Sequence, residues 1–273
     1  KTQPEHEKNG QGLLFSGILM LIAISDGEGV QSNTLKAMVA FGDLPSVDVA
    51  IHSDTTHEQS ATYAHRAKWL PFWEDRDIRC VTVKPARTLD FERAGSRCAS
   101  IQIPAFTQRP GYWGTKTFKD GTKKRIWKNG SGQLRRQCTQ RWKIAPMRKW
   151  LQANRGKEPV ELWIGFSLDE IQRIKPSNVK YITNRYPLIE KRMTRAKCIK
   201  YLEAHQIEVP AKSSCVFCPY HNKAAWRKLY QTGSGDWHKA VEIDNAARKV
   251  RPPYNLFVHS SRKPLEQIAS EID

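Results

Sequence analysis

Residues 21–41 read "LIAISDGEGVQSNTLKAMVAF", an apolar run, a turn with two glycines and then helical spacing. The apolar run from Leu13 to Ile24 predicts a buried strand, because it is too short to span a bilayer and leads into a charged loop. The turn predicts an anion site, since its flexible backbone N–H groups would lie at the positive end of the following helix. The loop residues that we expect at this site are Ser25, Gly27, Gly29, Gln31 and Ser32.

Two carboxylates, Asp26 and Glu28, lie inside the same turn. Each would repel a bare phosphate by about 1 kcal/mol if it were exposed to solvent. A Mg²⁺ ion, which prefers carboxylate and phosphate oxygens, or nearby basic side chains would offset that repulsion. We therefore expect anion binding here to depend on one or the other. A tight turn without a ligand, with Ser32 in the first helical turn, is the alternative.

The next segments continue the alternation of strands and helices. Strands are predicted at 47–55 and 78–85, with helical spacing at 58–76 between them. Strand, helix, strand, helix, strand is typical of a doubly wound, mostly parallel α/β sheet. Ligands bind such sheets at the carboxyl ends of the strands, which selects the 25–32 loop and the segment Ser53–Asp54–Thr55.

The predicted domain organisation follows from a change in composition and in the spacing of apolar residues along the chain. An α/β domain is expected over 12–175, interrupted by a basic loop at 109–136, and a helical C-terminal region over 176–273. Helical texture also appears at 139–156, and a strand at 160–166. The chain starts with Lys1, so residues 1–11 are set aside.

The formal net charge is +18, from 45 Lys and Arg against 27 Asp and Glu, and it indicates a polyanionic partner. Nucleic acid is the first candidate; a basic proteome, or a field that steers a nucleotide, is the alternative. The 109–136 loop has nine Lys or Arg and four aromatic residues, which suits phosphate contacts and base stacking. A solvated hairpin is its alternative. The residues expected to contact nucleic acid are Lys116, Lys123, Lys124, Arg125, Trp127, Arg135 and Arg136.

Six cysteines without secretory features indicate free thiols and a reducing, cytoplasmic setting. Cys215 and Cys218 form a C-x-x-C half-site for zinc or an iron–sulfur cluster, and Cys138 and Cys198 are candidates to complete it. His221 is the alternative to Cys198, which also has the spacing of a core residue. Cys80 is expected in the core, and Cys98 is a candidate reactive thiol.

Four ordered segments resemble the adenine-nucleotide α-hydrolase (PP-loop) superfamily, and within it the phosphoadenosine phosphosulfate reductase-like branch. They are the 25–32 loop, "HSDTTHEQSATYAH", "GFSLDEIQR" and "YPLIEKRMTRAKCIKYL". The resemblance implies an α/β nucleotide-binding fold and favours a [4Fe–4S] cluster over zinc. It also implies ATP or phosphoadenosine phosphosulfate as substrate, with Mg²⁺. The matching positions are Asp54, Thr55, Glu58, Tyr63, Gly165, Glu170 and Arg173; Asp54, Glu170 and Arg173 are the expected catalytic residues, and Asp54 and Thr55 the further nucleotide contacts.

Two departures from the family pattern shape the functional hypothesis. Gln31 stands where the PP-loop usually has Asp, and no cysteine follows Cys218, whereas the family's reductases use a C-terminal Cys-Gly-x-His nucleophile. The leading hypothesis is therefore ATP-dependent adenylation and sulfur transfer on a nucleic acid, tRNA or DNA, with an iron–sulfur cluster. A sulfonucleotide reductase and a non-catalytic nucleic-acid-binding module are the alternatives. A sulfur-donor or thiol-reductant protein is the further expected partner, and no membrane is expected.

Overall fold

The computed structural model describes residues 20–89, 101–250 and 252–272. These residues form two compact units whose segments alternate along the chain. The sheet unit consists of the residues up to Ser53, Ala64–Val83 and Met147–Lys212. The hairpin unit consists of Asp54–Tyr63, Lys84–Pro146 and the residues from Ser213 onward.

This division differs from the one expected from the sequence at residue 175. Residues 176–212 belong to the sheet unit because they supply its last strand and two helices that cover it. The 109–136 segment belongs to the other unit. A change of composition along the chain cannot reveal units that are built from interleaved segments.

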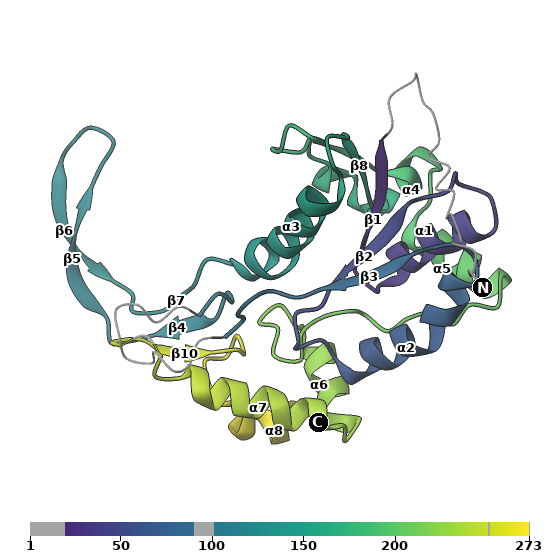
Figure 1. Ribbon diagram of the computed structural model, residues 1–273. Helices are drawn as coiled ribbons and strands as arrows, with labels where there is room; N and C mark the ends of the chain where they lie inside the picture. The colour runs from purple at the N-terminus through teal and green to yellow at the C-terminus, as the bar shows by residue number, and fades with distance from the viewer. Residues whose placement is uncertain (1–19, 90–100, 251, 273) are drawn as a thin grey trace, which may run out of the picture. The chain divides into compact units, whose positions relative to one another are not determined.

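The sheet unit is built on five parallel strands in the order β3-β2-β1-β8-β9. β1, β2, β3 and β8 run side by side in Figure 1. The first three strands fill one half of the sheet and the last two the other, so the direction of winding reverses beside β1. The doubly wound α/β fold that the sequence predicts is confirmed. The strands are β1 (Leu21–Asp26), β2 (Val49–Ser53), β3 (Cys80–Val83), β8 (Val160–Ile164) and β9 (Ile182–Arg185).

The central strand is apolar because helices cover the sheet on both of its faces. Ile22 and Ile24 pack with the helical residues Leu35 and Leu202. Ala23, which points to the opposite face, packs with Leu151. The helices of this unit are α1 (Val30–Ala40), α2 (Ser60–Glu74), α3 (Ala145–Asn154), η2 (Leu168–Arg173), α4 (Pro187–Glu190) and α5 (Arg195–Ala204); α2 and α3 each begin in the hairpin unit.

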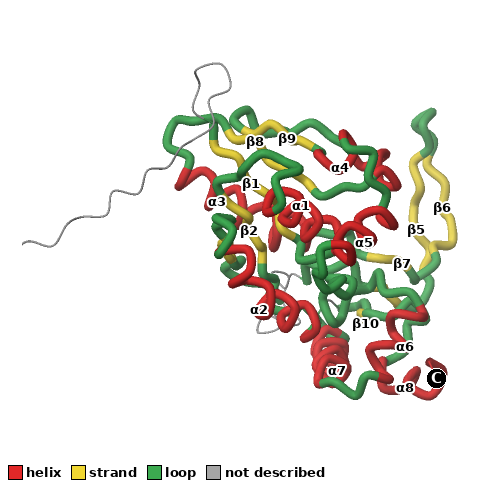
Figure 2. Tube along the Cα trace, turned by 90° about the vertical axis from the view of Figure 1, so that its right-hand side faces the viewer, coloured by secondary structure: helices red, strands yellow, loops and turns green. Residues whose placement is uncertain are grey.

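The hairpin unit has its own core and two small antiparallel sheets. Trp142, Phe217 and Trp226 are almost fully buried in this core, together with residues of the C-terminal helices. Figure 2 shows β5 and β6 running side by side to their turn. The elements are β4 (Phe106–Gln108), β5 (Tyr112–Thr117), β6 (Lys123–Lys128), β7 (Gly132–Gln133), η1 (Thr139–Ile144), α6 (Lys223–Gln231), α7 (Gly235–Ala247), β10 (Asn255–Phe257) and α8 (Leu265–Ile272).

Some sequence-based expectations fall on parts of the chain outside the described residues. These include Cys98 and the first part of the apolar run that begins at Leu13. Among the described residues, no helix is both long and apolar enough to cross a membrane.

Truncation of a buried side chain of α1 should test the core that carries the sheet. Leu35 is fully buried, so Leu35→Ala should lower the free energy of unfolding by about 2–5 kcal/mol in urea titrations followed by circular dichroism. Leu168→Ala is the matched control, because Leu168 is exposed, and it should change stability by less than about 0.5 kcal/mol. Equal effects of the two variants would contradict this packing.

Candidate functional site

The loop between β1 and α1 presents backbone rather than side chains. A Cβ added at Gly27 or at Gly29 would meet no atom within 4 Å. The N–H groups of the first helical turn have no partner within α1 and point toward this loop. The Ser32 hydroxyl bonds to the backbone of Gly29 and so fastens the turn. We call the 25–32 loop the cradle, because the sequence predicts an anion site there. Ser25 is half-buried near the end of β1.

Asp26 and Glu28 are buried beneath this cradle and form ion pairs. The Lys36 ammonium, on α1, lies 2.7 Å from an Asp26 oxygen and 3.4 Å from a Glu28 oxygen. Arg66, on α2, forms a second ion pair with Glu28 and lies 3.6 Å from Asp26. Glu28 has a φ of 51°, a left-handed conformation that is uncommon for a residue with a side chain. Two cations and two anions therefore meet under the loop.

The environment of these four groups keeps Asp26 and Lys36 charged. Burial alone would raise the pKa of Asp26, but the Lys36 ammonium and His52 hold it far below 3.8. Burial alone would lower the pKa of Lys36, but Asp26 and Glu28 raise it above 10.5. The pKa of Glu28 is raised by burial and by the adjacent Asp26 charge.

This network decides between the two sequence-based expectations for the acidic turn. Asp26 and Glu28 are 3% and 1% exposed, and their oxygens face Lys36 and Arg66. They do not fit a contact with a Mg²⁺ ion carried by a bound phosphate. Compensation by basic side chains, the other expectation, is present.

At the point where the winding of the sheet reverses, the turn after β8 approaches the start of α1. A Cβ added at Gly165 would lie 3.1 Å from the backbone nitrogen of Ser32. The Gln31 side chain donates a hydrogen bond to Glu170 over 3.2 Å, and Glu170 also pairs with Arg173. Parallel α/β sheets bind their ligands at this kind of edge, between strands of opposite winding.

A further cation joins this group. The Arg195 guanidinium, at the first position of α5, donates to Gln31 Oε1 over 3.1 Å. Its backbone N–H donates to Asp169. The sequence did not predict Arg195, because only the packing of α5 against α1 brings it to Gln31. The sheet unit thus contains all the residues that were predicted in the 25–32 loop and in the segment after β8: Ser25, Gly27, Gly29, Gln31, Ser32, Gly165, Glu170 and Arg173.

The predicted residues Asp54 and Thr55 belong to the hairpin unit and follow β2 in the chain. Asp54 accepts a 2.7 Å hydrogen bond from the Tyr63 hydroxyl and another from the Thr56 N–H, and it lies 3.4 Å from the Lys84 ammonium. Burial would raise its pKa, but these contacts hold the pKa below 3.8. Asp54 is therefore an ionised carboxylate at neutral pH.

A second polar cluster surrounds Glu58, whose side chain is fully buried. The Lys143 ammonium lies 2.9 Å from Glu58 Oε1, and the Thr55 and Ser213 hydroxyls each donate to Glu58 over 3.3 Å. The Thr55 hydroxyl also lies 3.3 Å from the Cys215 sulfur. We call these residues the Glu58 cluster: Thr55, Glu58, Lys143, Ser213 and Cys215.

The C-x-x-C segment is fixed by backbone pairing with the same stretch. Glu58 and Cys215 form an antiparallel bridge, and Val216 donates to the His57 carbonyl over 2.9 Å. Cys218 closes a turn by donating its N–H to the Cys215 carbonyl. Burial and, to a smaller extent, the negative charge of Glu58 raise the pKa of Cys215 to about 12. Burial also raises the pKa of Cys138. Both groups are therefore thiols at neutral pH.

The cluster predicted at Cys138, Cys198, Cys215 and Cys218 stays a prediction. Cys198 is fully buried and belongs to the hydrophobic core of the sheet unit. Within the ranges that the structure describes, no group of three or more His, Cys, Asp or Glu residues is arranged to hold a metal ion. His221, the alternative ligand, hydrogen-bonds to the Ser214 hydroxyl instead. Cys80 lies in β3, partly buried, as expected from the sequence.

The predicted basic residues lie in two places of the hairpin unit. Arg135 and Arg136 are exposed between β7 and η1, and Arg136 lies over the ring of Tyr220. The others lie on the β5–β6 hairpin: Lys116, Lys123, Lys124, Arg125 and Trp127.

No protein-family model and no curated protein matches this sequence. Among solved structures, the chain is similar to a phosphoadenylyl-sulfate (PAPS) reductase from Candida auris in a phosphate complex. The TM-score is 0.42 and the sequence identity 13%, over 70% of this chain and 74% of that chain.

Removal of the buried Lys36 ammonium should lower the free energy of unfolding, because the acidic turn loses a compensating charge. Lys36→Met removes the ammonium that contacts both buried carboxylates and leaves Arg66 as their remaining ion-pair partner, so it should destabilise the sheet unit by about 3–5 kcal/mol. Urea unfolding measures the loss. Lys68→Met is the matched control, because Lys68 pairs with Glu208 at the surface with 63% of its side chain exposed. This control should cost less than about 1 kcal/mol; a loss as small for Lys36→Met would contradict the network.

His57 supplies a test that depends on pH. Burial and the nearby Lys239 ammonium lower the pKa of His57 to about 4 from 6.5. Because the unfolded chain then binds a proton that the folded chain does not, stability should fall as the pH drops from 6.5 toward 4. The fall should be smaller in His57→Gln, measured by urea titration at each pH. A pKa near 6.5 for His57 by NMR titration would refute this.

Proposed function

We propose that this chain is an adenine-nucleotide-dependent enzyme of the PP-loop type that performs sulfur chemistry. The observation that carries the proposal is the meeting of the α1 N-terminus with the Gly165 turn, where the winding of the sheet reverses. At this point the Gln31 side chain donates a hydrogen bond to Glu170 and accepts one from Arg195. Backbone N–H groups and guanidinium groups are the donors that phosphate oxygens prefer.

The leading reaction is adenylation of a nucleic acid followed by sulfur transfer. An acceptor oxygen attacks the α-phosphorus of MgATP, and the bond to the pyrophosphate oxygen breaks. A sulfur nucleophile from an external donor then attacks the carbon that bears the adenylated oxygen, and AMP leaves. The α1 N-terminus and Arg195 would stabilise the charge that develops on pyrophosphate. We route no step through an iron–sulfur cluster, because no group of three or more His, Cys, Asp or Glu among the described residues is arranged to hold a metal ion.

Three of the six thiols are poorly suited to the alternative reaction. Reduction of phosphoadenosine phosphosulfate needs a thiolate to attack sulfur. Burial raises the pKa of Cys80 to about 11, of Cys198 to about 11 and of Cys215 to about 12, so none of these three is a ready nucleophile. The reductase remains the alternative proposal.

The ion pairs of the acidic turn weigh against a non-catalytic module. Unpaired acidic residues in the 25–32 loop would favour such a module, but Asp26 and Glu28 form ion pairs with Lys36 and Arg66. The open backbone at Gly27 and Gly29 then faces an anion without a net opposing charge.

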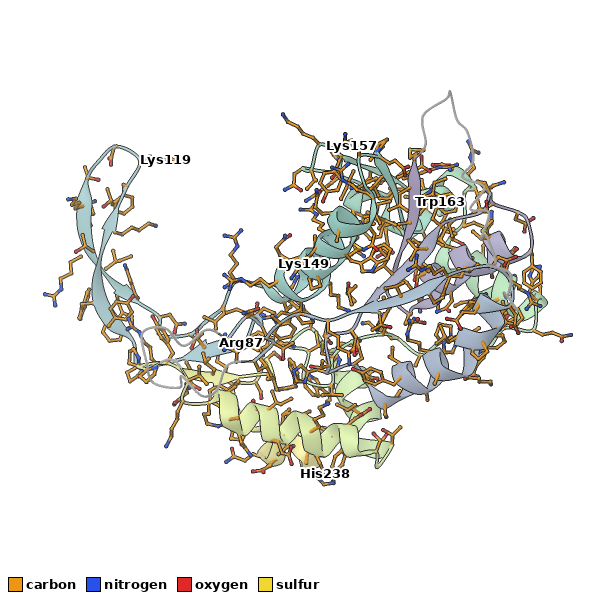
Figure 3. The ribbon with its side chains drawn as sticks, in the orientation of Figure 1. Arg87, Lys119, Lys149, Lys157, Trp163 and His238 are labelled. Carbon is orange, nitrogen blue, oxygen red and sulfur yellow. The ribbon has the colours of Figure 1, made fainter. Side chains whose placement is uncertain are left out.

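Release of pyrophosphate from MgATP tests the proposal. Release should require a nucleic acid, and Arg195→Ala should lower kcat/KM by about tenfold or more, because one charge-assisted contact to the leaving group is lost. Lys157→Ala is the matched control: Lys157 precedes β8 and so lies at the amino ends of the strands, away from the cradle (Figure 3). Its activity should be unchanged.

Three outcomes would decide against the leading reaction. Pyrophosphate release that is absent with both RNA and DNA would overturn adenylation. Sulfite formed from phosphoadenosine phosphosulfate and a thiol reductant would establish the alternative. Tight nucleic-acid binding without either reaction would leave the binding module.

A further inference from the structure

The β5–β6 hairpin has two different faces, which follow from its register. Trp113 pairs with Trp127 and Thr115 with Arg125. Directly paired residues of an antiparallel ribbon share a face, and successive residues alternate between faces. The residues of one face, which we call the Trp face, are Trp113, Thr115, Thr117, Lys123, Arg125 and Trp127; the opposite face carries Tyr112, Gly114, Lys116, Lys124, Ile126 and Lys128.

The hairpin carries positive charge and an exposed aromatic surface. Trp113 is 56% and Trp127 58% exposed, values that are unusual for the largest apolar side chain. Residues 112–128 contain six Lys or Arg and one Asp, so their formal charge is +5. Lys119 lies at the turn of this hairpin (Figure 3). A two-stranded ribbon alone is marginally stable, so a ligand that covers the indoles would stabilise it.

The two tryptophans are held in a defined arrangement. Their rings lie 5.6 Å apart with an interplanar angle of 73°, so a planar group can stack on one ring while the other borders it. The Arg125 guanidinium lies 5.5 Å from the centre of the Trp113 ring. A Cβ at Gly111 would lie only 2.4 Å from Trp127 Cζ2, so the indole packs directly against the Gly111 backbone.

The base of the hairpin is also fixed. A Cβ at Gly130 would lie 1.7 Å from the Arg109 carbonyl oxygen, so this position requires glycine. The Arg109 guanidinium stacks on Tyr112 at 3.5 Å and lies 4.9 Å from the Tyr254 ring. These contacts tie the ribbon to the segment that leads into β10. The Trp face is thus a preorganised surface.

We propose that the Trp face of the β5–β6 hairpin binds single-stranded nucleic acid, with an unpaired base stacked on the indoles and phosphates contacted by Lys123 and Arg125. Positive charge selects a polyanion, and exposed indole faces select bases that are not already stacked in a duplex. This inference deepens the proposed function and rests on it only for the role of the strand as acceptor.

Binding of a short fluorescently labelled single strand to the full chain, measured by anisotropy without ATP, tests the proposal. Trp113→Ala and Trp127→Ala should each weaken binding by about tenfold. Gly111→Ala should weaken it as well, although no aromatic or charged group is removed, because the new Cβ displaces Trp127. Trp127→Phe, which keeps an aromatic face, should retain most of the affinity.

A pair of charge variants separates the two faces. Lys123→Gln with Arg125→Gln removes two charges from the Trp face, and Lys116→Gln with Lys124→Gln removes two from the opposite face. The first pair should weaken binding more than the second. It should also reduce the slope of log K against the logarithm of salt concentration by about 1.4, because two phosphate contacts are lost. Equal losses for both pairs would overturn the assignment of the face.

Other outcomes would overturn the proposal outright. They are unchanged affinity in both tryptophan variants, a duplex that binds as tightly as the single strand, and binding to phosphatidylserine vesicles without binding to the oligonucleotide. Because the binding assay contains no ATP, a failure of binding is distinguishable from a failure of pyrophosphate release. Circular dichroism of each variant confirms that the fold is kept.

Discussion

The ion-pair network of Asp26, Glu28, Lys36 and Arg66 is the constraint on which the sheet unit depends. It joins the end of β1 to two helices, since Lys36 comes from α1 and Arg66 from α2. Each buried charge would be costly alone, and each is offset by an opposite charge in the same enclosed space. The network permits acidic residues at the start of a helix that otherwise favours anions.

At the cradle, the charged side chains that stabilise the loop are different from the backbone groups that it exposes. The ionic side chains lie beneath the loop, and the open surface above it is glycine backbone. In the proposed function, recognition of the anion would be left to backbone N–H groups and to Arg195, which hydrogen-bonds to Gln31. Such a division keeps the cradle rigid while its surface stays free of side chains that would compete with a ligand.

The hairpin unit uses burial differently. In the Glu58 cluster an ammonium, a carboxylate and a thiol share one enclosed space, and burial keeps Cys215 protonated. On the β5–β6 hairpin the largest apolar side chains are exposed among cations. One unit of this chain therefore contains both a closed polar centre and an open aromatic surface, and the two suit different roles.

The sequence by itself determined the α/β class, the 25–32 loop and the basic hairpin, because local periodicity and composition report on short segments. It also contained a sign of the network, a lysine inside the apolar helix "TLKAMVAF". Only the tertiary structure decided that Asp26 and Glu28 pair with Lys36 and Arg66, that Arg195 reaches Gln31 and that Cys198 is a core residue. These contacts join residues distant in the chain, and their energies depend on burial, which no local pattern of residues specifies.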